Sequence, residues 1–217
     1  MTHLEIEFKE RLVPFADAGS WEKFRAFSPT GLVPCLIDHD VTVWESLAII
    51  EYLAERHPEI WPQDPRARVW ARSAAAEMHA GFGAIRNRRP MTVGLTIELK
   101  EFHADLTQDL TRLVELWAQG LSQFAGPFLA GSRFTAVDAF FAPVVFRANT
   151  YQLPLDEPTQ DYADRILNLP GMQRWYSKAC AETWRETCHE EEIRDLGRSV
   201  EDRRSPEYKP VAIGRMT

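Results

Sequence analysis

Three prolines at positions 58, 62 and 65 divide the sequence into two stretches of different periodicity. Proline removes a backbone donor and fixes φ, so a continuous helix or strand through these residues is disfavoured. The residues before the prolines show short, mixed patterns, whereas those after them are helical in pattern almost throughout. We therefore expect an α/β unit at residues 1–57, a linker at 58–64, an all-helical domain at 65–192 and a loose tail at 193–217.

The first unit shows the element order β-α-β-β-α. Apolar and charged residues alternate over residues 4–8, which predicts a half-buried strand. A short helix is expected over residues 21–27, after Ser20. Residues 35–37 and 41–44 are β-formers joined by a tight turn, which predicts an antiparallel hairpin, and the following residues 45–56 are helical in pattern.

The second stretch carries clear helix boundaries. Asp64 is a candidate N-cap with Pro65 at the first helical position. Apolar residues spaced by three or four predict a long helix over residues 99–124. Thr135 and Asp138 have the spacing of a capping box, in which each side chain accepts from the other's backbone N–H. A last helix is expected around residues 172–183.

Composition narrows the class of partner. The formal net charge of the 217-residue chain is −7, so we expect no nucleic-acid partner and no anionic membrane surface. No apolar run is long enough to span a membrane, and residues 1–7 lack a signal-peptide core. Cys35, Cys180 and Cys188 form no C-x-x-C pair, which is typical of reduced thiols in the cytoplasm and predicts no metal site.

Val33 and Pro34 stand immediately before the first hairpin strand. A proline there is a candidate for a cis peptide bond, which lies only about 0.5–1 kcal/mol above trans. Such a turn would leave the Val33 N–H and C=O free to pair with an extended peptide added as a strand. The alternative is an ordinary proline at the start of a strand, without a ligand.

Glu45 and Ser46 begin the helix after the second hairpin strand. Free backbone N–H groups and the helix dipole favour a carboxylate there, the Ser46 hydroxyl adds a donor, and Glu45 can meet an ammonium group. These groups together match one amino-acid zwitterion, although a simple N-cap is the alternative interpretation. Because a single hairpin separates the two dipeptides, we expect both at one end of the sheet, where a tripeptide fits across them.

Two segments carry a family resemblance. Residues 27–36, FSPTGLVPCL, and residues 44–53, WESLAIIEYL, are similar to the glutathione transferase family. The element order agrees with the thioredoxin-like half of that family, and residues 134–138 resemble the capping-box helix of its helical half. Residues 72–91 resemble a bacterial subgroup. Each motif is weak alone, but all occur in order along the chain.

The resemblance implies an incomplete thioredoxin-like N-terminal half followed by an all-helical C-terminal domain, in a cytoplasmic homodimer. Val33, beside a cis Pro34, would bond the cysteinyl part of glutathione through its backbone, and Glu45 and Ser46 would hold the γ-glutamyl group. Glutathione would be the co-substrate, and a small apolar electrophile the second partner. Family members often carry a lysine before the Val-Pro pair. The chain has Leu32 instead, which removes an expected contact to the glycyl carboxylate.

The resemblance also raises an expectation about the N-terminus. In the family, a strand, a loop and a helix precede the strand expected at residues 4–8, and that loop supplies the hydroxyl or thiol that meets the glutathione sulfur. We expect this βα unit, of about 20 residues, to be missing from the sequence as given, with Met1 an internal methionine of a longer product. No catalytic residue is therefore assigned.

The thiols of the chain are weaker candidates. Cys35 follows a proline in an apolar strand, so we expect a buried structural cysteine rather than a nucleophile. Cys188 and His189 are neighbours on a predicted helix and do not face each other, so we expect a solvated helix end.

Four cationic or titratable residues lie within or just after the first helix of the second stretch. Arg86, Arg88 and Arg89 could face an electrophile between the two halves, but surface cations near a helix C-terminus are the favoured interpretation. His79 is expected to be packed or solvent-facing, because the sequence suggests no partner for it.

Two functions of different class remain open. The first is an enzyme that conjugates glutathione to small apolar electrophiles, with activity doubtful if the sulfur-activating loop is missing. The second is a non-catalytic, glutathione-transferase-like binding or regulatory protein.

Overall fold

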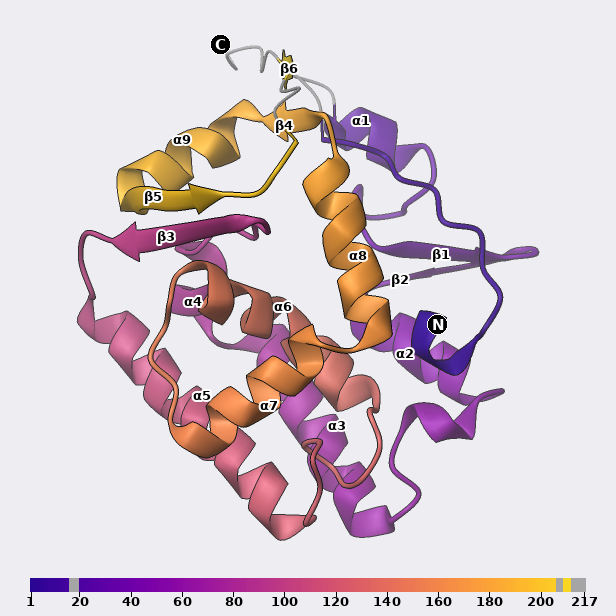
Figure 1. The fold of residues 1–217 in the computed structure, drawn as a ribbon. Coiled ribbons are helices and arrows are strands. Elements are labelled where there is room, and N and C mark those ends of the chain that lie inside the picture. The colour runs from indigo at the N-terminus through magenta and orange to yellow at the C-terminus, as the bar shows by residue number, and fades with distance from the viewer. Residues whose placement is uncertain (16–19, 206–208, 212–217) are drawn as a thin grey trace.

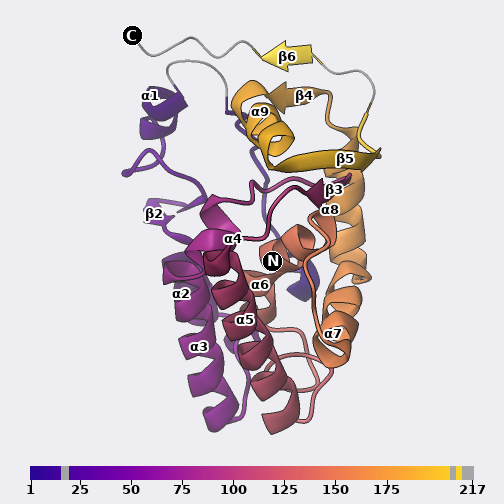
Figure 2. The same ribbon diagram turned by 90° about the vertical axis from the view of Figure 1, so that its left-hand side faces the viewer.

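The computed structural model describes residues 1–15 and 20–205, together with the backbone of residues 209–211. A small β-hairpin and its helices lie beside a larger group of helices (Figure 1). Figure 2 shows the long helices α3 (Pro65–Ala80) and α5 (Ala104–Gln123) running side by side. The fold has a small N-terminal β/α part and a helical C-terminal part, as the sequence predicts.

The hairpin follows the prediction closely. Strands β1 (Cys35–Asp38) and β2 (Val41–Trp44) pair antiparallel, and the pair Asp38 and Val41 leaves His39 and Asp40 as the two-residue turn. His39 has φ 55, the left-handed conformation that such tight turns require. Helix α1 (Ser20–Arg25) precedes the hairpin and α2 (Ser46–Ala54) follows it.

One side chain of α2 and one just beyond its end contact the hairpin. The Tyr52 hydroxyl donates to the Asp38 carboxylate at 2.7 Å, and Arg56 donates to the same oxygen at 2.8 Å. Both bonds hold the pKa of Asp38 below its usual range. The orientation of α2 against the sheet is therefore set by polar contacts as well as by packing.

The strand expected over residues 4–8 does not form. Thr2–Leu4 is a short 3₁₀ helix, and residues 5–15 have no regular secondary structure. Leu4 and Ile6 pack against the helical core, so the apolar positions are satisfied without strand pairing. A strand needs a neighbour for its N–H and C=O groups. A pocket of about 640 Å³ lies between this segment and β1, and among the described residues no strand pairs with it.

The predicted start of the first helix in the second half is confirmed by its N-cap. Asp64 accepts a hydrogen bond from the Ala67 N–H at 2.8 Å, and Pro65 occupies the first turn of α3. Helix α5 is followed by α6 (Ala136–Thr150), α7 (Glu157–Leu167) and α8 (Pro170–Ala181). The buried core lies between α3, α5, α6 and α7 and contains large aromatic side chains.

The capping box at the start of α6 is formed as predicted. The Thr135 N–H donates to the Asp138 carboxylate at 2.8 Å. Asp138 is fully buried and also accepts from the Leu129 N–H at 3.0 Å and the Tyr162 hydroxyl at 3.2 Å. This carboxylate therefore joins the start of α6 to the preceding loop and to α7 at the centre of the core.

The C-terminal segment differs from the expected loose tail. Helix α9 (Thr187–Leu196) leads into strand β5 (Gly197–Asp202), which pairs antiparallel with β3 (Leu95–Leu99). The predicted long helix starts at Ala104 rather than residue 99, because Leu99 belongs to β3. Strand β4 (Trp184–Glu186) also pairs, in parallel, with β6 (Lys209–Val211).

The β3–β5 pair lies across the end of the helical group at which α3 terminates (Figure 2). Leu95 and Ile97, which belong to β3, are buried. The tail prediction is wrong for residues 197–202 because their partner strand lies about a hundred positions earlier, beyond the reach of local periodicity.

Candidate binding site at the end of the hairpin

The hairpin register brings the two candidate dipeptides to one end of the sheet. Cys35 is the partner of Trp44 in the ladder. Val33–Pro34 directly precedes Cys35, and Glu45–Ser46 directly follows Trp44. The convergence expected from the sequence is therefore present.

Val33 offers unpaired backbone groups at this end. The Val33–Pro34 peptide bond is cis, as the sequence suggested. Neither the N–H nor the C=O of Val33 has a backbone partner within the described part of the chain, since the ladder begins only at Cys35. The Val33 residue is 45% exposed. An extended ligand can therefore reach this edge.

Glu45 holds an unusual backbone conformation at the start of α2. It is the N-cap residue, with φ 67 and ψ 125, and its side chain does not cap the helix. A non-glycine residue at positive φ costs on the order of 1–3 kcal/mol and is concentrated at functional sites. Sequence patterns contain no signal for this conformation.

The first turn of α2 is open for an anionic group. The first N–H groups of a helix lack intrahelical acceptors, and here no side chain caps them. The Ser46 hydroxyl stands at the same turn, and the Glu45 carboxylate is 48% exposed. The turn therefore combines donors for a carboxylate with one acceptor for an ammonium group.

His79 contacts Glu45 from the helical half. Its Nε2 lies 3.6 Å from the Glu45 Oε2, although the sequence suggested no partner. His79 stands in the last turn of α3, and its backbone carbonyl accepts from Arg86 at 2.5 Å. Thirty-four positions separate His79 from Glu45 (79 − 45 = 34), so no local signal would have found this contact.

The three candidate arginines have different environments. Arg86 donates to the carbonyls of Met78 and His79, which confirms its prediction as a cation at a helix C-terminus. Arg88 is exposed and pairs with Asp105 at 2.6 Å.

For Arg89 the prediction of a surface cation is wrong. Its side chain is 1% exposed, and its Nε has no hydrogen-bond partner within the described residues. Burial lowers the pKa of Arg89, because desolvation disfavours the charged form. The polar sequence Arg-Asn-Arg-Arg at residues 86–89 gave no indication that the Arg89 side chain is buried.

The thiols show no nucleophile arrangement. Cys35 is half-buried, its Sγ donates to the Phe27 carbonyl at 3.4 Å, and burial raises the pKa of the thiol. Cys188 is exposed, and the neighbouring His189 contacts the Glu186 carboxylate. Among the described residues, no group of His, Cys, Asp and Glu side chains is arranged to hold a metal ion. No helix within the same residues is long and apolar enough to cross a membrane.

Comparison with known families agrees with this geometry. Residues 1–56 match the family described as glutathione S-transferase, N-terminal domain, and residues 96–177 match the corresponding C-terminal domain. The two matches together cover more than half of the chain.

The chain belongs to the glutathione S-transferase family.

Individual relatives of this glutathione S-transferase are distant. A probable maleylacetoacetate isomerase of Vibrio cholerae is 27% identical over 195 residues, covering 85% of this chain and 88% of the relative. A maleylacetoacetate isomerase of Rattus norvegicus is 27% identical over 150 residues, covering 67% of this chain and 68% of its own.

Among solved structures, a theta class glutathione S-transferase of Xanthomonas axonopodis pv. citri with glutathione bound is 28% identical. It superposes with a TM-score of 0.53, covering 71% of this chain and 76% of that one.

Proposed function

We propose that this chain binds glutathione at the hairpin end. The Val33 N–H and C=O would pair with the cysteinyl backbone, beside Pro34. The Glu45 carboxylate would receive the γ-glutamyl ammonium group, and Ser46 with the first N–H groups of α2 would bind the γ-glutamyl carboxylate. The observation that carries the proposal is the register Cys35 to Trp44, which sets both dipeptides at one end of the sheet.

Charge and hydrogen bonding support this orientation of the ligand. A carboxylate at a helix N-terminus gains from the dipole and from unpaired donors. Within the described residues, the Val33 N–H and C=O have no backbone partner, as an added extended peptide requires. The solved relative with glutathione bound adds independent support.

The proposed reaction is conjugation of glutathione to a small apolar electrophile. The glutathione thiol loses its proton, the thiolate attacks the electrophilic carbon, and a carbon–sulfur bond forms while the leaving group departs with its electron pair. Lowering a thiol pKa from about 8.5 to about 6.5 requires about 2.7 kcal/mol of preferential thiolate stabilisation. None of the four binding residues is assigned that role, so binding and turnover are tested separately.

Isothermal titration calorimetry tests binding with a matched pair of variants. Glu45→Gln removes the charge that would meet the ammonium group, and we expect glutathione affinity to fall about 10-fold or more. Glu55→Gln is the control, because Glu55 is exposed at the end of the same helix and forms no ion pair within the described residues. Equal affinities for the two variants would refute the site.

An aryl halide assay tests turnover. Conjugation above the glutathione-only background supports the transferase, whereas binding without turnover supports a non-catalytic glutathione-binding protein. Failure to bind glutathione at all would reject both.

A second candidate reaction is glutathione-dependent isomerisation of a cis double bond conjugated to a carbonyl. Several relatives are named maleylacetoacetate isomerase. The thiolate would add to the double bond, the resulting single bond would rotate, and the thiolate would leave, so that glutathione is regenerated. Consumption of glutathione distinguishes the two reactions, since conjugation uses one molecule per turnover and isomerisation uses none.

We infer a cytoplasmic homodimer with a glutathione-binding unit at 1–57, a linker at 58–64 and a helical domain at 65–192. The family resemblance supports the dimer, and the three unpaired cysteines support the compartment. Light scattering after size exclusion tests the oligomeric state, and a monomer at micromolar concentration would contradict it.

A further inference from the structure

A second pocket lies at the opposite end of α3 from Glu45. It has a volume of about 330 Å³ and is lined by the linker, the start of α3, Phe124 at the end of α5 and the loop before α6. Helix α3 has 16 residues, so its two ends are about 24 Å apart at the standard rise. The pocket is therefore separate from the proposed glutathione site.

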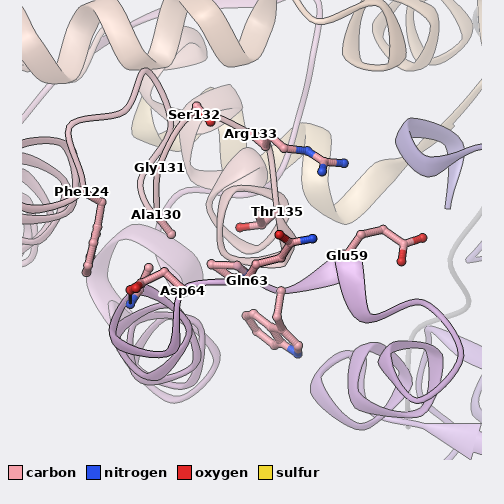
Figure 3. A pocket seen from close by; sticks show the side chains of 12 residues that line it. Glu59, Gln63, Asp64, Phe124, Ala130, Gly131, Ser132, Arg133 and Thr135 are labelled. Atoms are coloured by element: carbon pink, nitrogen blue, oxygen red, sulfur yellow. Dashed lines mark hydrogen bonds between the residues drawn. The ribbon is translucent and has the colours of Figure 1, made fainter.

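Loop residues 130–133 and the linker face each other across this pocket (Figure 3). Ser132 and Arg133 come from the loop, and Gln63 and Asp64 from the linker side. Phe124 and Trp61 supply aromatic walls. The volume falls in the range of sites for small organic molecules.

The two acidic side chains of the pocket differ in their contacts. Asp64 caps α3 by accepting from the Ala67 N–H at 2.8 Å. Glu59 lies 3.5 Å from a His57 ring nitrogen, and its side chain is 35% exposed. Asp64 is therefore occupied by the helix, whereas Glu59 keeps its carboxylate partly in solvent.

The unengaged polar groups of the pocket are donors. Arg133 is exposed and makes no hydrogen bond or ion pair within the described residues, and the side chains of Ser132 and Gln63 are likewise without one. Trp61 is 2% exposed, and its indole Nε1 is a buried donor with no partner within the same residues. Buried donors in native proteins are almost always satisfied, so an unpaired donor on a residue that lines a pocket calls for an explanation, and a bound acceptor is one.

We propose that this pocket binds a small planar carboxylate, with its aromatic or unsaturated body against Phe124 and its carboxylate on Arg133. Guanidinium groups bind carboxylates through paired, charge-assisted hydrogen bonds. Ser132 and Gln63 add neutral donors around the same oxygens. The ligand class follows from an aromatic lining combined with donors that have no partner among the described residues.

Calorimetry with 2-naphthoate tests the site on the full chain. We expect saturable binding to the wild type at submillimolar to millimolar concentration, weakened about tenfold or more in Arg133→Gln. Arg174→Gln is the matched control, because Arg174 is an exposed arginine on α8 that also forms no ion pair within the described residues. Its affinity should equal that of the wild type. The neutral 2-naphthamide should bind at least about tenfold more weakly than the carboxylate.

Independence from the glutathione site is part of the test. Saturating glutathione should leave naphthoate affinity unchanged, and Arg133→Gln should leave glutathione affinity unchanged. The proposal is overturned if naphthoate shows no saturable binding, if the two arginine variants behave alike, or if glutathione displaces naphthoate. Because Arg133 is exposed and makes no hydrogen bond or ion pair within the described residues, Arg133→Gln should leave the fold intact.

Discussion

His79 in the last turn of α3 places its Nε2 3.6 Å from the Oε2 of Glu45, and so connects the helical half to the start of α2. The His79 ring therefore lies beside the carboxylate that the γ-glutamyl ammonium group would use. The contact connects the helical half to the proposed glutathione site.

We expect His79→Gln to change glutathione affinity by about twofold to fivefold, because it replaces the ring beside the Glu45 carboxylate, while both side chains are partly exposed and the interaction is screened. His57→Gln is the control, because His57 pairs with Glu59 away from the site, and its affinity should equal that of the wild type. Calorimetry measures both variants. Equal affinity in His79→Gln and wild type would contradict the link.

Asp138→Asn should destabilise the core. The buried carboxylate accepts from the backbone N–H groups of Leu129 and Thr135, and an amide would present a donor to one of them. Leaving such a group unsatisfied costs about 1–3 kcal/mol. Urea unfolding measures the loss. Asp161→Asn on the exposed side of α7 should change the free energy of unfolding by less than about 0.5 kcal/mol.

The same carboxylate should give stability a specific pH dependence. Burial raises the pKa of Asp138 to about 6, whereas an unfolded Asp titrates near 3.9. Between these values the native state holds more protons than the unfolded state. The contribution of Asp138 to the free energy of unfolding therefore falls as the pH rises from about 4 to about 6, and is level above that. Urea unfolding of wild type and Asp138→Asn at several pH values measures this contribution as a difference between the two slopes of unfolding free energy against pH. Parallel curves for the two proteins would refute the raised pKa.

Gly197→Ala should disrupt the β3–β5 pair. A Cβ at Gly197 would lie 2.3 Å from the Glu98 carbonyl oxygen and 2.8 Å from the Ile97 side chain. Overpacking of this kind costs about 1–3 kcal/mol, and amide exchange in β3 should accelerate. Gly171→Ala is the control, because nothing lies within 4 Å of its added carbon. Unchanged protection of β3 in Gly197→Ala would count against the tight approach.

The ion pair between α2 and α3 should contribute little. Arg72 donates to both oxygens of Glu51, at 3.2 Å and 3.0 Å, but both side chains are close to half exposed. We expect Glu51→Gln to change the free energy of unfolding by less than about 1 kcal/mol in thermal or urea denaturation. A larger loss would mean that the two halves depend on this pair.

Features encoded by neighbouring residues were predictable from the sequence. The two-residue turn of the hairpin, the Asp64 cap and the Thr135–Asp138 box each depend on residues a few positions apart. The convergence of Val33 and Glu45 was also predictable, because one short hairpin fixes their relation.

Features that depend on distant partners were not predictable. Residues 4–8 have a strand-like pattern, but no strand among the described residues pairs with them, and Leu4 and Ile6 pack against the core instead. Strands β3 and β5 pair in the fold although about a hundred positions separate them in the sequence. The burial of Arg89 and the positive φ of Glu45 likewise result from tertiary packing that overrides local preference.

The β3–β5 ladder also affects the order in which the molecule is completed. Leu95 and Asp202 are partners, so the earlier strand is synthesised long before the later one exists. Contacts between such distant residues close slowly, because loop-closure entropy must be overcome first. During translation the apolar residues of β3 remain without their partner strand until residues 197–202 have emerged. A ribosome-stalled chain in which residues 197–202 are still inside the exit tunnel should therefore leave β3 unpaired.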